Sequence, residues 1–393
     1  MEYKNQFFFS ATLRGLCAST IQLASPGFDK PARRMAETVL VTGVSGFIGA
    51  HVAKSALAAG FAVKGTVRSD AWNARLEAAL APSGRIEIVA LDLLASTEEE
   101  FAAALRGCRY LAHVASPFPG GSVSDEQMAA AVDGTAKILR AAKAAGVERV
   151  VLTSSVAAVS NNWPKAGAGA AVAHGKSEGD PFVPADWSVL EGMSSSYAES
   201  KTRAEQGARA LAEELGLELI TVHPSFVQGA MLLPRAESTT SASLCKRVLE
   251  GAMPAVPPVG MNTCSVADVA DTHVAALRAP AAVVGARLIV ASGNILLTDL
   301  ATRIAAAHPD WPVKTRRLPW FAAKLYRCAI CLRSFRQHLL AAHRAPPFLP
   351  RTPAMQFNHL SGRYSNVPRI RFHARKKQKR VQGAWFDATR ARA

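Results

Sequence analysis

The chain has 393 residues, of which 49% are hydrophobic and 19% charged, so it can bury a sizeable core and is not intrinsically disordered. Its formal net charge of +16 lies at the two ends: residues 1–34 carry +3, residues 333–393 carry +13, and the 27 basic and 27 acidic residues between them cancel. This excludes a nucleic-acid-binding protein that acts through the overall charge of its folded body.

The first 34 residues differ from the rest of the chain. They are poor in acidic residues and contain Ser, Thr and Arg, as organelle transit peptides do. Two interpretations stay open: a transit peptide, or a segment outside the mature fold because translation starts at Met35. We expect a cytoplasmic protein, or a mitochondrial or plastid protein if residues 1–34 are a transit peptide.

From Glu37 onward, short apolar segments alternate with alanine-rich or amphipathic ones. The pattern predicts strands at 38–42, 61–68, 85–93, 109–115, 149–155 and 217–224. It predicts helices at 47–60, 97–107, 124–146 and 197–215. Regular alternation of this kind indicates an α/β fold, with a parallel sheet covered by helices on both faces.

Beyond Gly229 the alternation loosens. We expect a helix near 240–251, a strand near 287–292 and a helix at 298–308. Residues 160–196 are rich in Gly, Ala, Pro and Asp and are expected to form an insertion with little regular structure.

The sequence predicts neither a membrane span nor a metal site. No run of 18 apolar residues is free of charge, and the six cysteines are scattered as in a protein of a reducing compartment. Cys328 and Cys331 precede His338 and His343, but six residues separate the inner pair, where a zinc finger has about a dozen. The basic run RKKQKR at 375–380 lacks neighbouring aromatic residues, so we expect a solvated tail and no nucleic-acid partner.

A glycine-rich turn follows the first predicted strand. In TGVSGFIG (42–49), Gly43 permits a tight turn, Gly46 lets the backbone approach a pyrophosphate, and Gly49 lets the helix lie close to the strand. The N-terminus of the helix then faces the phosphates. A tight turn without a ligand is the alternative, and the strand–turn–helix context argues against it.

The second strand indicates which dinucleotide is bound. An NAD site usually has a carboxylate near the end of this strand, whereas here Arg68 comes first and Asp70 follows. A guanidinium binds a 2′-phosphate, so Arg68 favours NADP(H) over a role as a solvated surface residue. Asp92 and Leu93, at the end of the third strand, are candidates to line the adenine pocket; a turn-capping role for Asp92 is nearly as well supported.

The stretch SSSYAESK (194–201) places Tyr197 and Lys201 four residues apart on one helix face. A phenol is a weak acid–base group at neutral pH, and a nearby ammonium favours the phenolate. Serines of the segment TSS (153–155) end the fifth strand, at the rim where such sheets bind ligands. The tyrosine–lysine spacing is common by itself and becomes specific in this context.

Together these residues resemble the extended short-chain dehydrogenase/reductase family, within the NAD-dependent epimerase/dehydratase superfamily. The resemblance covers about Glu37 to Leu332 and is strongest with dihydroflavonol reductases and cinnamoyl-CoA reductases. It is carried by VTGVSGFIG (41–49), GTVR (65–68), HVASPF (113–118), RVVLTSS (149–155), YAESK (197–201) and HPSFVQG (223–229).

The resemblance implies a Rossmann-type doubly wound parallel sheet with a smaller C-terminal substrate lobe, NADP(H), and a catalytic set of Ser155, Tyr197 and Lys201. In that family Tyr197 would protonate the carbonyl, Lys201 would lower the tyrosine pKa and hold the ribose, and Ser155, rather than Ser154, would bind the carbonyl. The implied cofactor-binding residues also include Ser45, Phe47, Ile48, Ala115, Ser116, Pro224 and Ser225.

Three features depart from the family. His223 stands where asparagine is often found, and Ser155 lies 42 positions before Tyr197, because of the insertion. The ending of the fold that relatives show after about residue 340 is not found: either the basic tail has replaced it, or the gene prediction is wrong there.

We therefore expect an extension at 1–34, an NADP-binding domain at 35–230, a substrate lobe at 231–340 and a poorly ordered tail at 341–393. The expected activity is the NADPH-dependent reduction of an aldehyde or ketone to an alcohol, by a monomer or homodimer whose partner is a small carbonyl compound. Alternatives are a hydroxysteroid dehydrogenase, a sugar epimerase, or a non-catalytic NADP-binding sensor or scaffold.

Overall fold

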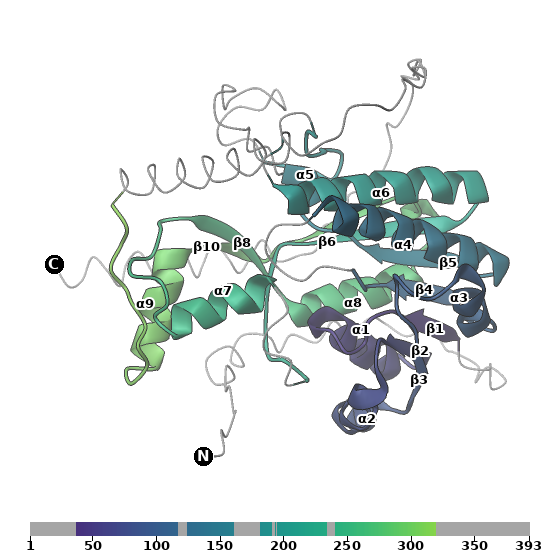
Figure 1. Ribbon diagram of the computed structural model, residues 1–393, viewed down its shortest axis with the longest axis horizontal. Helices are drawn as coiled ribbons and strands as arrows, with labels where there is room; N and C mark the ends of the chain where they lie inside the picture. Colours follow the sequence, from purple (N-terminus) through teal and green to yellow (C-terminus); the bar gives the residue numbers. More distant parts are fainter. Residues whose placement is uncertain are drawn as a thin grey trace, which may run out of the picture. The chain divides into compact units, whose positions relative to one another are not determined.

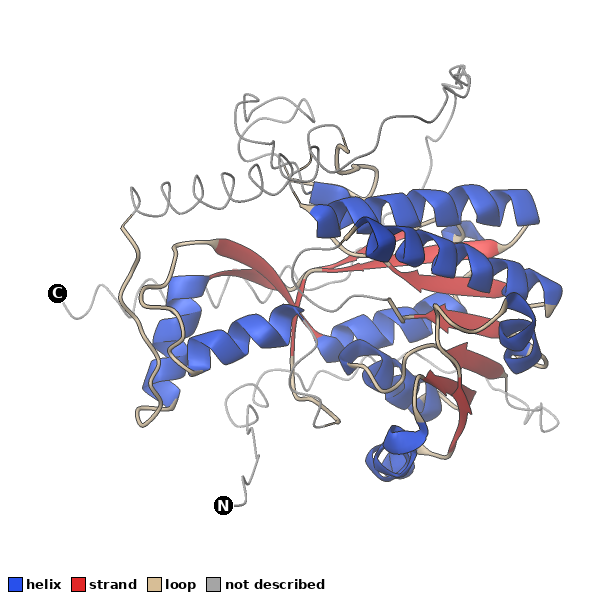
Figure 2. Ribbon diagram, in the orientation of Figure 1, coloured by secondary structure: helices blue, strands red, loops and turns tan. Residues whose placement is uncertain are grey.

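A parallel β-sheet organises the computed structural model, which describes residues 37–116, 124–160, 181–190, 193, 195–233 and 240–319 (Figures 1 and 2). Within these residues the strands run in the spatial order β3 (Ile86–Ala90), β2 (Ala62–Val67), β1 (Thr38–Val41), β4 (Tyr110–His113), β5 (Arg149–Thr153), β6 (Glu218–Pro224) and β9 (Arg287–Val290). All neighbouring strands in this sheet pair in parallel. The predicted α/β, Rossmann-type sheet is confirmed.

Helices cover both faces of the sheet, because its strands are apolar on both sides. In β1, Val39 and Val41 pack into one core cluster and Leu40 into the other, and all three are fully buried. The first face carries α1 (Phe47–Ala58), α2 (Asn73–Leu80) and α8 (Val266–Leu277). The second face carries α3 (Glu98–Leu105), α4 (Asp125–Ala144) and α6 (Ser196–Leu215), as Figure 1 shows.

A second, smaller sheet follows the main one in the chain. Its strands are ordered β10 (Gly293–Leu296), β8 (Gly260–Ser265) and β7 (Phe226–Gln228). Next to it, α7 (Thr240–Leu249) and α9 (Leu297–Ala307) form a cluster with the buried side chains of Val248, Leu297 and Ile304. The remaining short elements are α5 (Ala157–Ser160), η1 (Asp70–Trp72), η2 (Ala81–Ser83) and η3 (Ala281–Val283).

Several predicted boundaries change. The predicted strands 109–115 and 149–155 end at His113 and Thr153, so the serines and alanine that follow them lie in loops. The elements α2, β8, α8 and β10 were not predicted from the sequence. The N-terminal extension, residues 161–180 of the predicted insertion, the Cys/His cluster after residue 327 and the basic tail lie outside the described residues. The proposed domain boundaries stay predictions.

Candidate active site

A cavity of about 1160 Å³ opens at the carboxyl ends of the strands. Strand order reverses between β1 and β4, and this is where an open parallel sheet binds its ligands. The wall of the cavity contains every residue predicted for the site: Gly43, Ser45, Gly46, Phe47, Ile48, Gly49, Arg68, Asp92, Leu93, Ala115, Ser116, Ser155, Tyr197, Lys201, Pro224 and Ser225. The fold thus brings together positions that are spread over more than 180 residues of the chain.

The turn between β1 and α1 needs its glycines for steric reasons. Gly43 has a φ of +68°, and a Cβ there would lie 3.1 Å from the Cβ of Ala115. A Cβ on Gly49 would lie 2.3 Å from the carbonyl oxygen of Gly43, so no larger residue fits. No side chain caps α1, whose N-cap is Gly46, whereas Thr97 caps α3. The first amides of α1 are therefore open toward the cavity, a geometry that suits a pyrophosphate.

Arg68 lies just beyond β2 with an exposed side chain on the cavity wall. It makes no ion pair with any residue in the described part of the chain. The nearest following carboxylate, that of Asp70, accepts a hydrogen bond of 3.2 Å from the side-chain amide of Asn73. At the end of this strand the guanidinium of Arg68 is thus available to a ligand, whereas the carboxylate of Asp70 is already hydrogen-bonded.

Asp92 lines the cavity and also caps a turn. Its Oδ1 accepts hydrogen bonds from the backbone N–H groups of Leu94 (2.7 Å) and Ala95 (3.2 Å). The turn-capping role considered for this residue is present, and it leaves room for a contact with a ligand because the second oxygen has no such bond.

Ser155 and Tyr197 meet at the wall of the cavity. Ser155 follows β5, where its Oγ accepts a hydrogen bond from the N–H of Ala157 (3.1 Å) at the start of α5. Tyr197 is in the first turn of α6, which Ser195 caps by accepting from the N–H of Ala198 (3.2 Å). Burial raises the pKa of Tyr197, and a hydrogen bond with Ser155 lowers it in part. The phenol is therefore protonated at neutral pH and can serve as an acid.

Lys201 lies one helical turn after Tyr197 and is half-buried. Burial lowers the pKa of its ammonium to about 8, and the charge of Glu205 acts against this decrease. Lys201 is therefore mainly protonated at neutral pH. Burial, together with the charge of the same ammonium, lowers the pKa of His113 to about 3, so its imidazole is neutral.

The sequence matches a protein-family model. Residues 39–291 match the NAD dependent epimerase/dehydratase family, over more than half of the chain. The chain belongs to this family.

Named members with similar sequences are reductases. The tetraketide alpha-pyrone reductase 1 of Arabidopsis thaliana is 33% identical over 291 residues, which cover 71% of this chain and 83% of the relative. The cinnamoyl-CoA reductase 1 of the same plant is 31% identical over 290 residues, covering 71% and 77%. These relatives confirm the predicted resemblance to this reductase branch and support an oxidoreductase activity in general.

The solved structure of Gre2 from Candida albicans, in complex with NADPH, is similar in fold. It has a TM-score of 0.59 and 27% identity, with 72% of this chain and 86% of that chain covered. Within the described residues of this chain, no helix is long and apolar enough to cross a membrane. The same residues contain no cluster of metal-ligating side chains.

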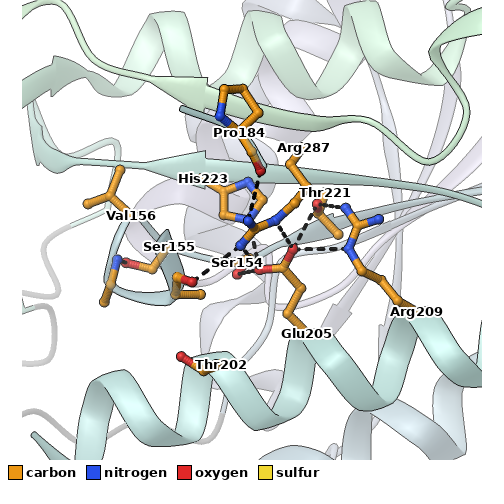
Figure 3. A network of polar contacts seen from close by, with 12 residues as sticks. Ser154, Ser155, Val156, Pro184, Thr202, Glu205, Arg209, Thr221, His223 and Arg287 are labelled. Atoms are coloured by element: carbon orange, nitrogen blue, oxygen red, sulfur yellow. Dashed lines mark hydrogen bonds and ion pairs between the residues drawn. The ribbon is translucent and has the colours of Figure 1, made fainter. Parts of the chain in front are cut away.

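Two groups of residues at this family site were not found from the sequence. Thr42 accepts hydrogen bonds from the N–H groups of Val114 and Ala115, both at 2.9 Å, and thereby joins the glycine turn to the loop after β4. Glu205 is the central acceptor of a buried polar network that includes Ser154, His223 and Arg287 (Figure 3). A threonine before a glycine turn, and a glutamate eight residues after the tyrosine, were the available signals.

Proposed function

We propose that the chain is an NADPH-dependent reductase that converts an aldehyde or a ketone to an alcohol. The observation that carries the proposal is that Ser155, Tyr197 and Lys201 line the same cavity as the glycine turn, with Tyr197 hydrogen-bonded to Ser155. The reductase names of the relatives support the same direction of reaction.

The residues of the cavity suit this cofactor. The uncapped amides at the start of α1 would hold the pyrophosphate, and the Arg68 guanidinium would bind the 2′-phosphate. The NADPH complex of the similar Gre2 structure supports the choice of NADP(H) over NAD(H). When bound, NADPH supplies the hydride that reaches the carbonyl carbon.

The chain's own side chains then act on the carbonyl oxygen. The Ser155 hydroxyl donates a hydrogen bond that holds this oxygen beside the phenol. As negative charge develops on the oxygen, the O–H bond of Tyr197 breaks and the proton forms the hydroxyl of the alcohol. The ammonium of Lys201 stabilises the phenolate that remains, and solvent returns a proton to it.

The test follows NADPH absorbance at 340 nm with the full chain and a panel of aromatic and aliphatic aldehydes and ketones. We expect turnover with at least one carbonyl compound and loss of turnover, with NADPH binding retained, in Tyr197→Phe. NADPH binding without turnover of any compound would favour the sensor interpretation. Failure to bind either NADPH or NADH would overturn the cofactor assignment.

A further inference from the structure

Glu205 is a buried carboxylate one helical turn beyond Lys201 on α6. Its side chain is 1% exposed, and it is not part of the wall of the main cavity. A void of about 20 Å³ is bordered by Glu205 and by Ser154 and Lys201, which also line the main cavity. This void holds about one water molecule, so bulk solvent does not screen the carboxylate from the ammonium of Lys201.

The carboxylate connects α6 to two strands of the main sheet, β6 and β9, and to the loop after β5 (Figure 3). Its Oε2 accepts hydrogen bonds from the Ser154 hydroxyl and from Nε2 of His223, both at 2.7 Å. Its Oε1 accepts from Nε of Arg287 at 2.7 Å. Ser154 is adjacent to Ser155 in the loop after β5, and His223 precedes Pro224, which lines the cavity. The bonds to Ser154 and His223 therefore end beside residues of the candidate active site.

The network extends further through Arg287, which is itself buried. Its guanidinium donates hydrogen bonds to the carbonyl oxygens of Pro184 (2.8 Å) and Asp186, and it lies 3.7 Å from the ring centroid of Trp187. It also donates to the carbonyl oxygen of Ala158 in α5, at 3.3 Å. Glu205 and Arg287 thus hold α6, the segment 181–190 and the helix that follows Ser155 at fixed positions.

Stability alone gives little reason for such a cluster. Buried ionic groups can often be replaced by well-packed apolar residues of similar volume without loss of stability, because their desolvation costs as much as their attraction gains. Glu205 is buried and accepts hydrogen bonds from residues of α6, β6, β9 and the loop after β5. A group with these directional bonds fixes geometry, and the geometry that it fixes is that of the adjacent cavity wall.

We propose that Glu205 is a positioning residue for the Ser155, Tyr197 and Lys201 set, an inference that rests on the proposed function. Through Ser154 it fixes the loop that carries Ser155. Through α6 it fixes the helix turn that carries Tyr197 and Lys201. It touches none of the reacting atoms.

An electrostatic consequence distinguishes this role from simple support of the fold. Among the described residues, the titratable groups that interact electrostatically with Lys201 are Glu205 on α6 and His113 on β4. Since His113 and Tyr197 are neutral at neutral pH, Glu205 supplies the negative charge that raises the pKa of Lys201. Removing this charge lowers the pKa of Lys201 below about 8.

The first experiment compares Glu205→Gln, which keeps the length but removes the charge, with Glu205→Asp, which keeps the charge but shortens the side chain. Both should lower kcat by roughly 10- to 100-fold with the KM for NADPH within about twofold, because misplacement by about 1 Å has effects of this size. Only Glu205→Gln should shift the fall of kcat to lower pH. Glu214→Gln, an exposed change of the same kind on α6, should leave both parameters as in the wild type.

A second readout does not depend on turnover. Competitive acetylation of lysines over a pH series, with mass spectrometry of the peptide that contains Lys201, reports the pKa of this side chain in any folded variant. The proposal predicts a lower pKa in Glu205→Gln and no change in Glu214→Gln. An unchanged profile in Glu205→Gln would overturn the positioning role, whereas absence of wild-type turnover would contradict only the proposed function.

If Glu205→Gln fails to fold, two smaller changes decide the matter. Ser154→Ala breaks only the link from Oε2 toward Ser155, and Thr221→Val breaks a link of 3.2 Å to Oε1, away from the cavity. We expect a roughly 3- to 10-fold lower kcat in Ser154→Ala and a wild-type value in Thr221→Val, as for the loss of one hydrogen bond. Equal values in the two variants would overturn the proposal.

Discussion

Oγ1 of Thr42 and Nδ1 of His113 are 3.0 Å apart, which joins the residue after β1 to the last residue of β4. The Thr42 oxygen already accepts two backbone N–H groups, from Val114 and Ala115. Its own proton therefore goes to Nδ1, and the neutral imidazole carries its hydrogen on Nε2. Protonation of this buried ring would put a second N–H group at Nδ1. Nδ1 would then lose the lone pair that accepts the proton of Thr42.

This relationship predicts a loss of stability in mild acid. The folded-state pKa of His113 is about 3 and that of the buried His273 about 4, both below the usual value of 6.5. The unfolded chain therefore binds more protons below pH 6.5, so stability falls as pH decreases from 6.5 toward 4. Each histidine contributes up to about 1.4 kcal/mol per pH unit.

The free energy of unfolding by urea, measured from pH 7 to 4.5, checks this prediction. The slope should become shallower in His113→Gln, by about one proton. Equal slopes in wild type and His113→Gln would show that His113 is charged in the folded state.

Arg68 should determine the preference for the phosphorylated cofactor. In Arg68→Ala we expect the Kd for NADPH to rise roughly 10- to 100-fold, because this change corresponds to the free energy of one charge-assisted hydrogen bond. The Kd for NADH should stay within about twofold of the wild-type value. Titration of intrinsic fluorescence measures both constants. Arg85→Ala, an exposed arginine that does not line the cavity, serves as the control. A parallel weakening of both cofactors would refute a 2′-phosphate contact.

Turnover should decrease at alkaline pH because the proposed mechanism requires Lys201 to be protonated. Its pKa is lowered to about 8 by burial, so the ammonium is lost as pH rises through this value. Below it both Lys201 and Tyr197 hold their protons. We expect kcat for carbonyl reduction to be level near neutral pH and to fall about tenfold per pH unit above 8 to 9. A kcat that stays constant to pH 10 would be incompatible with a role for the lysine charge.

Two glycine-to-alanine changes should act in opposite directions. A Cβ on Gly49 would collide with the Gly43 carbonyl at 2.3 Å, so Gly49→Ala should cost about 1–3 kcal/mol and weaken NADPH binding at least about tenfold. A Cβ on Gly207, inside α6, meets only Val132 Cγ1 at 3.9 Å. Gly207→Ala should raise stability by about 0.5–1 kcal/mol. Thermal unfolding and NADPH titration measure both, and a stable Gly49→Ala that binds normally would contradict the close packing of helix and strand.

The main sheet and the cavity wall were predictable because their signals are local. Buried strands such as Thr38–Val41 are apolar runs that end in a glycine turn. Residues that follow parallel strands meet at one edge, so Ala115, Ser155 and Ser225 reach the same cavity although each lies in a different part of the sequence.

The smaller sheet and α8 were harder to predict. β8 is a polar segment, GMNTCS, with little alternation, and its partner β10 is mostly exposed. For α8 a signal existed: Ser265 caps the helix and Asp268 lies in its first turn, followed by buried residues at helical spacing. The helical pattern was missed because the regular alternation of strands and helices ends before this segment.

The Glu205 network could not be read from spacing. One of its contacts joins Glu205 to Arg287, 82 positions apart. On α6, Glu205 stands among other charged residues, such as Arg203 and Glu213, that are exposed. Nothing local distinguishes the buried carboxylate from a solvated one, because its burial depends on strands that fold against the helix.

The most direct test of the proposed function is the fate of the hydride. NADPH that carries deuterium on the transferred position at C4 is incubated with the protein and a carbonyl compound that it turns over, and the alcohol is analysed by mass spectrometry and NMR. We predict one deuterium on the former carbonyl carbon in the wild type and none above background in Tyr197→Phe. An alcohol without deuterium at that carbon, or equal transfer by Tyr197→Phe, would contradict the proposed reductase and its Ser155, Tyr197 and Lys201 set.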